Sequence, residues 1–215
     1  AYWNYEDNMR FTEEMFSYMF PKLIGTMKVD VKDKEGETHT IDFTAPWPRV
    51  TFQELILKDA GIDLSKHTTV ESLREAITEK GIKIDGMNHL GLGNLIDHLY
   101  KKVSRPKLIS PIFLIGHPLE LSPLARKNDT NPNIVDRFQL VVATWEVLNA
   151  YSELVDPIDQ TQRFDAQSSA KDAGDTEAHS KDDEYVESME YGMPPISGFG
   201  MGIDRMVTLL TQQDN

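Results

Sequence analysis

Residues 198–205, with the sequence GFGMGIDR, have the types and spacing best suited to chemistry in this chain. Glycine at every second position packs no side chain in a strand and costs backbone entropy, so it suits a place where a ligand lies against the backbone. Arg205 then stands at the start of an apolar, helix-like segment, where free N–H groups already favour an anion. Together these features suit a nucleotide and its phosphates. On spacing alone, a glycine-rich turn with a surface arginine is an equal alternative.

A second candidate is the segment 145–153, WEVLNAYSE. In a regular strand Asn149, Tyr151 and Glu153 point to one face, because side chains alternate. A carboxylate on such a face needs a partner, since its desolvation is costly, and the ammonium of lysine is a suitable one. The alternative is that Tyr151 belongs to the core and Glu153 pairs with an internal arginine.

Several segments, in order, resemble one family. The glycine-rich segment resembles motif 3 of the class II aminoacyl-tRNA synthetases, and five others resemble the lysyl-tRNA synthetases of that class. The resemblance is close from residue 90 onward and looser before it; the matching segments are 117–128 (HPLELSPLARKN), 145–153, 162–164 (QRF), 170–175 (AKDAGD) and 192–195 (GMPP).

The resemblance implies a lysine site and an ATP site. Glu153 is implied to bind the ε-ammonium of lysine, with Tyr151 on the aliphatic stem and Asn149 at the carboxylate end. Arg205 is implied to contact the γ-phosphate end of a bent ATP as the catalytic arginine. Gly200, for the substrate, and Gly202, for the nucleotide, are implied to let the ligands lie against the sheet.

Glu146 is the implied ligand of Mg²⁺ and ATP. It has the opposite parity to Asn149, so we expect a bulge or bend between the two. The family usually has a second acidic residue where this chain has Gln139. Glutamine is neutral and a weaker Mg²⁺ ligand, so the substitution puts the number or affinity of bound metal ions in doubt.

No segment resembles motif 2, whose arginine binds the α-phosphate in this class. The family's dimer-forming motif 1 and its anticodon-binding barrel are not matched either. We therefore expect this chain alone not to form lysyl-adenylate. For the full-length enzyme the resemblance implies lysine, the acceptor end of tRNA-Lys and a second subunit as partners.

Composition limits the remaining possibilities. The chain has no cysteine, which excludes disulfides and cysteine-bound zinc and is compatible with the cytoplasm. No apolar stretch reaches eighteen residues and no signal peptide is recognisable, so no membrane association is expected.

The net charge of −13 argues against autonomous binding of tRNA, although residues 101–107 could form a local basic edge. Solvated charge at the C-terminal end of a helix, where cations are favoured, is the preferred explanation of that cluster. The histidines have no metal-ligand spacing, so no zinc is expected.

The elements that must position these residues follow from periodicity. Helices are expected over 5–20, ended by Pro21, over 51–58, from a capping box at 68–71 to Lys80, and over 92–103. A hairpin is expected around 33–36. The later elements are strands at 111–117, 136–142 and 145–153, helices at 156–173 and 183–191, a loop at 176–183, and the final glycine strand and helix. This order predicts an α+β fold: an antiparallel sheet flanked by helices, placed on one side of it, with a small helical insertion over 45–105.

The domain assignment is one partial class II catalytic domain over 1–215, with motif 3 at 198–210. Two other functions fit the same residues. One is a paralogue that transfers lysine to a translation factor. The other is a non-catalytic binding module derived from a synthetase, which Gln139 and the unmatched motifs favour.

Overall fold

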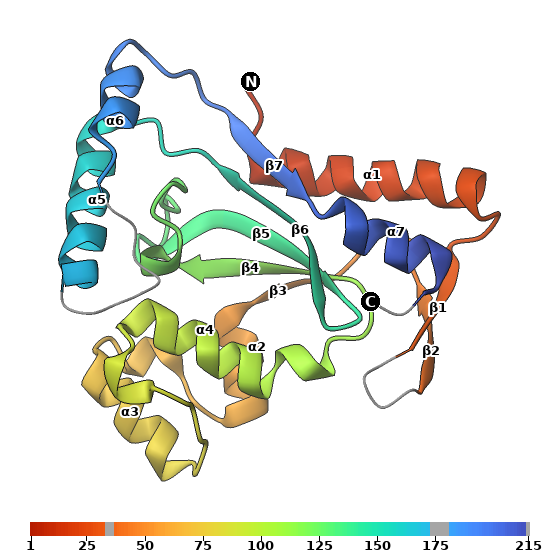
Figure 1. Ribbon diagram of the computed structural model, residues 1–215, viewed down its shortest axis with the longest axis horizontal. Helices are drawn as coiled ribbons and strands as arrows, with labels where there is room; N and C mark the ends of the chain where they lie inside the picture. Colours follow the sequence, from red (N-terminus) through yellow and green to blue (C-terminus); the bar gives the residue numbers. More distant parts are fainter. Residues whose placement is uncertain (33–36, 173–180, 214–215) are drawn as a thin grey trace.

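The computed structural model describes residues 1–32, 37–172 and 181–213. Its centre is a five-stranded sheet, and a separate hairpin pairs β1 (Lys28–Lys32) with β2 (Thr38–Asp42). In order across the sheet, the strands are β3 (Arg49–Thr51), β4 (Ile112–Pro118), β5 (Ile134–Val142), β6 (Trp145–Ser152) and β7 (Ser197–Met201) (Figure 1).

The predicted α+β class with an antiparallel sheet is confirmed, with one addition. Strands β4 to β7 are antiparallel, but β3 pairs with β4 in the parallel direction. The segment expected to be a purely helical insertion therefore also contributes a strand to the main sheet. Three residues are too few to show the alternation by which a strand is recognised in a sequence.

The turn between β5 and β6 is as tight as expected. Ala143 and Thr144 both have positive φ, 49° and 65°. Two such residues in succession are typical of a two-residue hairpin turn, whose twist matches that of the strands. The turn sets the register that places Gln139 opposite Asn149.

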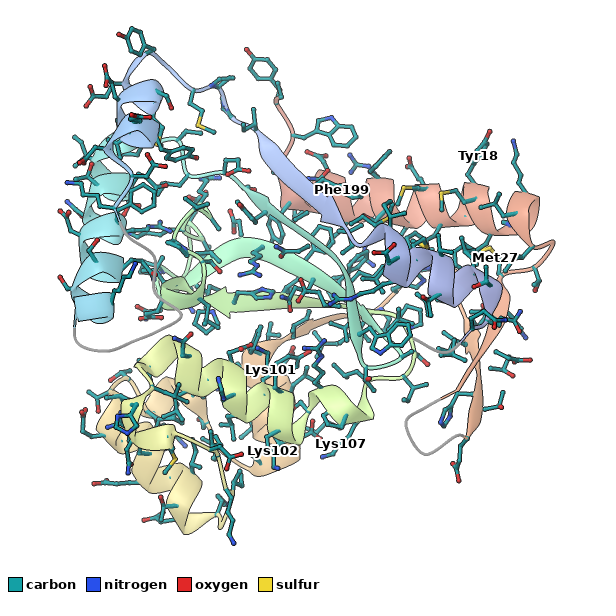
Figure 2. All side chains as sticks on the ribbon, viewed as in Figure 1. Tyr18, Met27, Lys101, Lys102, Lys107 and Phe199 are labelled. Atoms are coloured by element: carbon teal, nitrogen blue, oxygen red, sulfur yellow. The ribbon has the colours of Figure 1, made fainter. Side chains whose placement is uncertain are left out.

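One face of the sheet is covered by α1 (Tyr5–Leu23), α7 (Ile203–Thr211) and the β1–β2 hairpin (Figure 1). Pro21 was expected to end α1, but the helix continues to Leu23. The buried stripe contains Met9, Thr12, Phe16 and Phe20, whereas Phe11 is partly exposed. Phe11 contacts Phe199 of β7, with ring centroids 5.7 Å apart, so Phe199 points to this face and not to the glycine face (Figure 2).

The opposite face carries the insertion, so the prediction that the helices lie on one side was wrong. α2 (Phe52–Ala60), α3 (Val70–Glu79) and α4 (Leu92–Val103) form a second core that includes Leu114 and Val141 of the sheet. Thr51 caps α2 through Glu54, as expected. The expected capping box at 68–71 was wrong: Thr69 is the cap of α3 and accepts a hydrogen bond from the N–H of Ser72, so the reciprocal bond of Glu71 is not formed.

Short 3-10 turns connect the longer elements, at Leu64–Lys66, Met87–His89, Arg105–Lys107 and Leu119–Leu121. Helices α5 (Pro157–Asp172) and α6 (Asp183–Glu190) pack on each other beside the sheet, as expected from their patterns (Figure 1). The predicted turn at 33–36 lies outside the described residues, as does most of the predicted loop at 176–183. No helix in the described part of the chain is long and apolar enough to cross a membrane.

Candidate active site

A cavity of about 700 Å³ lies on the insertion face of the sheet. Its walls are the exposed part of that face, helix α4, the segment 117–125 and helix α5. Four of the predicted site residues line it: Gln139, Glu146, Asn149 and Tyr151. The other four lie outside this lining: Glu153 just after β6, Gly200 in β7, Gly202 between β7 and α7, and Arg205 in α7 (Ile203–Thr211).

The strand register explains why these side chains share a face. Gln139, Asn149 and Gly200 lie directly opposite one another across β5, β6 and β7. The next row contains Arg137, Tyr151 and Gly198. Opposed residues on antiparallel strands point to the same side, so both rows face the cavity side of the sheet.

The side chain of Glu146 reaches the same face because β6 contains a bulge. The bulge was expected, since Glu146 and Asn149 have opposite parity in the strand. Leu140 pairs with Leu148, but Val141 pairs with Glu146, so Val147 is an extra residue in β6. The shift turns the carboxylate of Glu146 toward Gln139, whose Nε2 donates to Oε2 of Glu146 at 2.8 Å. A neutral amide therefore stands against the carboxylate in this chain.

Arg205 is in the first turn of α7, at the end of the glycine-rich strand. Its Nη1 donates to the backbone carbonyl oxygen of Glu146. Gly202 caps the helix and donates its N–H to the carbonyl of Val147 at 2.9 Å. The bulge of β6 thus connects the predicted phosphate-binding arginine to the predicted metal ligand.

Arg137 is a site residue that the sequence analysis missed. Its guanidinium donates to Oδ1 of Asn149 at 2.8 Å and to Oγ of Ser122 at 2.9 Å. Burial lowers the pKa of Arg137, and the Glu146 carboxylate opposes that shift. Because the amide oxygen of Asn149 is occupied, its NH₂ group remains to donate toward a ligand carboxylate. The sequence pattern could have identified it. Arg137 lies two residues before Gln139 on the same strand, so the two side chains point to the same face.

Glu153 is half-buried beside Gly198. No hydrogen bond or ion pair of its carboxylate is found among the described residues, and burial raises its pKa to about 7. The alternative, that Glu153 pairs with an internal arginine, was wrong. Arg137 bonds to Asn149 and Ser122, and Arg163 pairs with Asp159. The carboxylate therefore needs a cation that the described part of the chain does not supply.

The three glycines of the segment 198–202 differ in their surroundings. A Cβ added to Gly198 would collide with Oε1 of Glu153. At Gly200 and Gly202 the nearest contacts of an added Cβ are 3.6 Å and 3.5 Å, which are ordinary distances. A side chain at 198 would thus displace the carboxylate of Glu153, whereas alanine at the other two positions displaces nothing.

His117 is also buried in the cavity wall and was missed. Its ring is 1% exposed and packs edge-on against Phe52, with centroids 4.8 Å apart. Gln139 lies beside the ring, but neither ring nitrogen has a partner in hydrogen-bond geometry within the described residues. Burial lowers the pKa of His117, so the ring is neutral.

The basic residues at 101–107 do not form a free cationic edge. Lys101 pairs with Asp97 at 2.5 Å, and Lys107 pairs with Asp59 at 2.9 Å. Arg105 donates from Nε to the carbonyl of Thr144 at 2.8 Å. Figure 2 shows Lys101 and Lys102 on α4 and Lys107 just beyond it. These contacts favour the second of the two explanations, exposed charge at a helix end, with Lys101 and Lys107 each paired with a nearby carboxylate.

An antiparallel sheet flanked by helices, ending in a glycine strand and an arginine at a helix start, defines the catalytic fold of a class II aminoacyl-tRNA synthetase. The whole chain, residues 1–215, matches the family described as class II tRNA synthetases (D, K and N), and the chain belongs to that family. The resemblance to lysyl-tRNA synthetases is confirmed by curated relatives.

Two relatives illustrate the match. The lysine–tRNA ligase of Bacillus mycoides (strain KBAB4) is 41% identical over 211 residues, which are 98% of this chain and 41% of the relative. The lysine–tRNA ligase of Fervidobacterium nodosum (strain ATCC 35602 / DSM 5306 / Rt17-B1) is 41% identical over 215 residues, which are 100% of this chain and 40% of the relative. The chain thus spans about two fifths of the length of the curated relatives it matches.

The family implies ATP and Mg²⁺, and the residues present fit both. Gly202 places bare backbone against the side chain of Arg205, where a nucleotide phosphate can approach both. Within the described ranges no three acidic or histidine side chains form a metal cluster. Mg²⁺ typically takes one or two carboxylates together with phosphate oxygens and waters, so Glu146 suits a cation that binds along with the phosphates.

Proposed function

We propose that this chain is part of the catalytic domain of a lysine–tRNA ligase, which activates lysine with ATP and transfers it to tRNA-Lys. The observation that carries the proposal is the half-buried carboxylate of Glu153, which has no cation among the described residues. It directly follows the strand that carries Tyr151 and Asn149, which can contact the stem and the carboxylate of an extended amino acid. Lysine has its ammonium, stem and carboxylate in that order.

The residues act by positioning and by charge. Glu153 holds the ε-ammonium, and the NH₂ group of Asn149, oriented by Arg137, holds the lysine carboxylate. Arg205 binds the γ-phosphate end of the nucleotide, and Glu146 holds the cation, which neutralises phosphate charge when bound. The lysine carboxylate is already ionised, so no residue has to remove a proton before it attacks the α-phosphate in line.

The domain assignment belongs to the same proposal. Residues 1–215 form one partial catalytic domain, the helical insertion lies within 45–105, and motif 3 lies at 198–210. In the full-length enzyme we expect a second subunit, the acceptor end of tRNA-Lys and a cytoplasmic location.

The test is ATP–pyrophosphate exchange with lysine, aspartate and asparagine in separate reactions. The full-length gene product should exchange with lysine and not with the other two, because Glu153 attracts a cationic side chain and repels a carboxylate. This chain by itself should not exchange, because no segment of it resembles motif 2. Lysine-independent exchange, or none by the full-length product, would contradict the proposal.

Two alternatives have distinct outcomes in the same system. A paralogue that modifies a translation factor would activate lysine but would not charge tRNA-Lys. A non-catalytic module is favoured by the Gln139–Glu146 hydrogen bond, which replaces the usual pair of acids by an amide and one carboxylate. It would bind lysine or ATP without exchange.

Alanine at Gly200 and at Gly198 should weaken lysine binding for two different reasons. Gly200→Ala should change the free energy of unfolding by less than about 1 kcal/mol, because its Cβ meets no close contact. It should still raise the KM for lysine about tenfold or more, as one methyl group obstructing a pocket does. Gly198→Ala should raise that KM as well, because its Cβ would displace Oε1 of Glu153. Its free energy of unfolding should change little, because the displaced atom is the end of a flexible side chain. Urea unfolding and exchange kinetics measure both; an unchanged KM for lysine in either variant would contradict this account.

A further inference from the structure

Helix α4 contributes two polar groups to the same cavity as Glu146. Asp97 and Tyr100 of the helix both line it. They lie in the insertion, more than 40 residues before Glu146 in the chain, and the proposed function uses neither. Their position follows from the packing of α4 over the cavity side of the sheet, where the insertion core reaches Leu114 and Val141.

Tyr100 carries a buried hydroxyl that lacks a partner. The residue is 2% exposed, and its Oη has no hydrogen-bond partner in the part of the chain that the structure describes. The ring is fixed against Phe52, with centroids 4.8 Å apart. Burial raises the pKa of Tyr100, and both Asp97 and Glu146 add to the rise while Arg105 opposes it. A buried polar group with no partner is unfavourable, so the hydroxyl indicates a ligand or an ordered water at this point.

Asp97 is a second carboxylate at this wall. Its side chain is 20% exposed and pairs with Lys101 at 2.5 Å. Asp97 and Glu146 both line the cavity, together with Arg137. Gln139, where the family usually has an acid, contributes no charge, and its NH₂ group donates a hydrogen bond to Glu146.

We propose that α4 shares in holding the hydrated divalent cation that accompanies the nucleotide, with Asp97 supplying the negative charge that Gln139 lacks. Mg²⁺ keeps several of its waters, and these polarised waters are strong hydrogen-bond donors that need acceptors. Asp97 and the Tyr100 hydroxyl are such acceptors. Both are positioning residues that act through water. The inference rests on the proposed function only in taking the cation to bind together with ATP.

The alternative is that Asp97 merely stabilises its helix through Lys101, four residues further on. The two accounts predict different effects of Lys101→Met on cation affinity. If Asp97 serves the cation, removing the competing ammonium by Lys101→Met should leave cation affinity unchanged or increase it. If the pair is only structural, Lys101→Met and Asp97→Asn should have the same effect.

The experiment is a titration of the full-length gene product with Mn²⁺ in the presence of ATP and without lysine, followed by electron paramagnetic resonance. Asp97→Asn should weaken Mn²⁺ binding about tenfold, as is typical when a residue next to the metal's own ligands is removed. Tyr100→Phe should weaken it about threefold without lowering the melting temperature, because it removes only an unpartnered hydroxyl. Asp85→Asn, an exposed change in the same insertion, is the matched control.

A double-mutant cycle with Gln139→Glu makes the test decisive. If Asp97 compensates for the missing acid, Asp97→Asn should weaken Mn²⁺ binding much less in the Gln139→Glu background than in wild type. Such a difference is a coupling between the two positions, which independent sites do not show. Additive effects, or unchanged Mn²⁺ affinity in Asp97→Asn, would overturn the inference, as would a wild-type protein that binds no Mn²⁺ with ATP. Lysine-dependent exchange is measured separately, so a failure of the proposed function is distinguishable from a failure of this inference.

Discussion

Glu153→Gln should reduce kcat/KM for lysine by about 10²- to 10³-fold in the full-length gene product. Removing one partner of a buried charge pair typically costs about 2–5 kcal/mol, because the other charge is left without compensation. The KM for ATP should change little, since Glu153 lies outside the nucleotide side of the site. The measurement is ATP–pyrophosphate exchange at varied lysine and at varied ATP.

The control is Glu184→Gln, an exposed carboxylate on α6. An equal effect of both substitutions, or an effect of Glu153→Gln that is confined to the KM for ATP, would contradict the lysine assignment. The conservative change keeps the size of the side chain, so a loss of activity reports the charge and not a cavity.

The same carboxyl should make lysine recognition depend on pH. Burial raises the pKa of Glu153 to about 7, so a falling fraction of the protein has an ionised Glu153 below that pH. The wild-type kcat/KM for lysine should therefore fall as the pH drops below about 7, approaching tenfold per unit. Glu153→Gln should lack this step. A wild-type profile that is flat between pH 6 and 8, about a unit either side of that pKa, would contradict it.

Stability without lysine should show the opposite dependence. The pKa of Glu153 in the folded protein lies above its ordinary value of 4.5, so the folded protein binds this proton more tightly than the unfolded chain does. The associated stability is present below about pH 4.5 and is lost as the pH rises through about 7. Glu153→Gln should consequently be more stable relative to wild type at pH 8 than at pH 5. Urea unfolding at the two pH values measures this.

Arg205→Ala should reduce kcat/KM for ATP by about 10³-fold. A fixed guanidinium at the first turn of α7 places positive charge where the phosphate chain develops negative charge, and removal of such a group typically costs about 10²- to 10³-fold or more. Arg205→Lys should recover only part of the loss, because an ammonium cannot contact phosphate through two parallel hydrogen bonds.

The matched control for Arg205 is Arg10→Ala on α1, an exposed arginine that pairs with Asp7. Both variants should keep the wild-type free energy of unfolding to within about 1 kcal/mol, because surface substitutions seldom cost more. Exchange activity of Arg205→Ala within tenfold of wild type would mean that Arg205 serves only to hold the Glu146 carbonyl.

Much of the local structure could be predicted from the sequence. The parity of Asn149 and Tyr151 identified one face of a strand, and the opposite parity of Glu146 required the bulge that is found at Val147. Repeating apolar residues located the long helices to within a few positions. These features depend on neighbours close in the chain, and a periodic pattern reports them directly.

Contacts between distant segments could not be predicted in this way. The strand β3 was missed because its three residues join the sheet through a parallel partner 64 residues away. Pro21 was taken as a helix end, but the chain accommodates it within the last turn of α1. Arg137 was missed because its importance comes from Asn149 and Ser122, on two other segments.

The sequence by itself therefore determined the family, the class of fold and which side chains share the glycine-rich face. Only the tertiary structure decided which of these groups have partners. It engages Arg137 with Asn149, leaves Glu153 without a cation in the described residues, and brings Asp97 and Tyr100 of α4 to the cavity of Glu146. The physical reason is that a residue's type and spacing specify its capacity for charge and hydrogen bonding, whereas the packing of remote elements specifies how that capacity is satisfied.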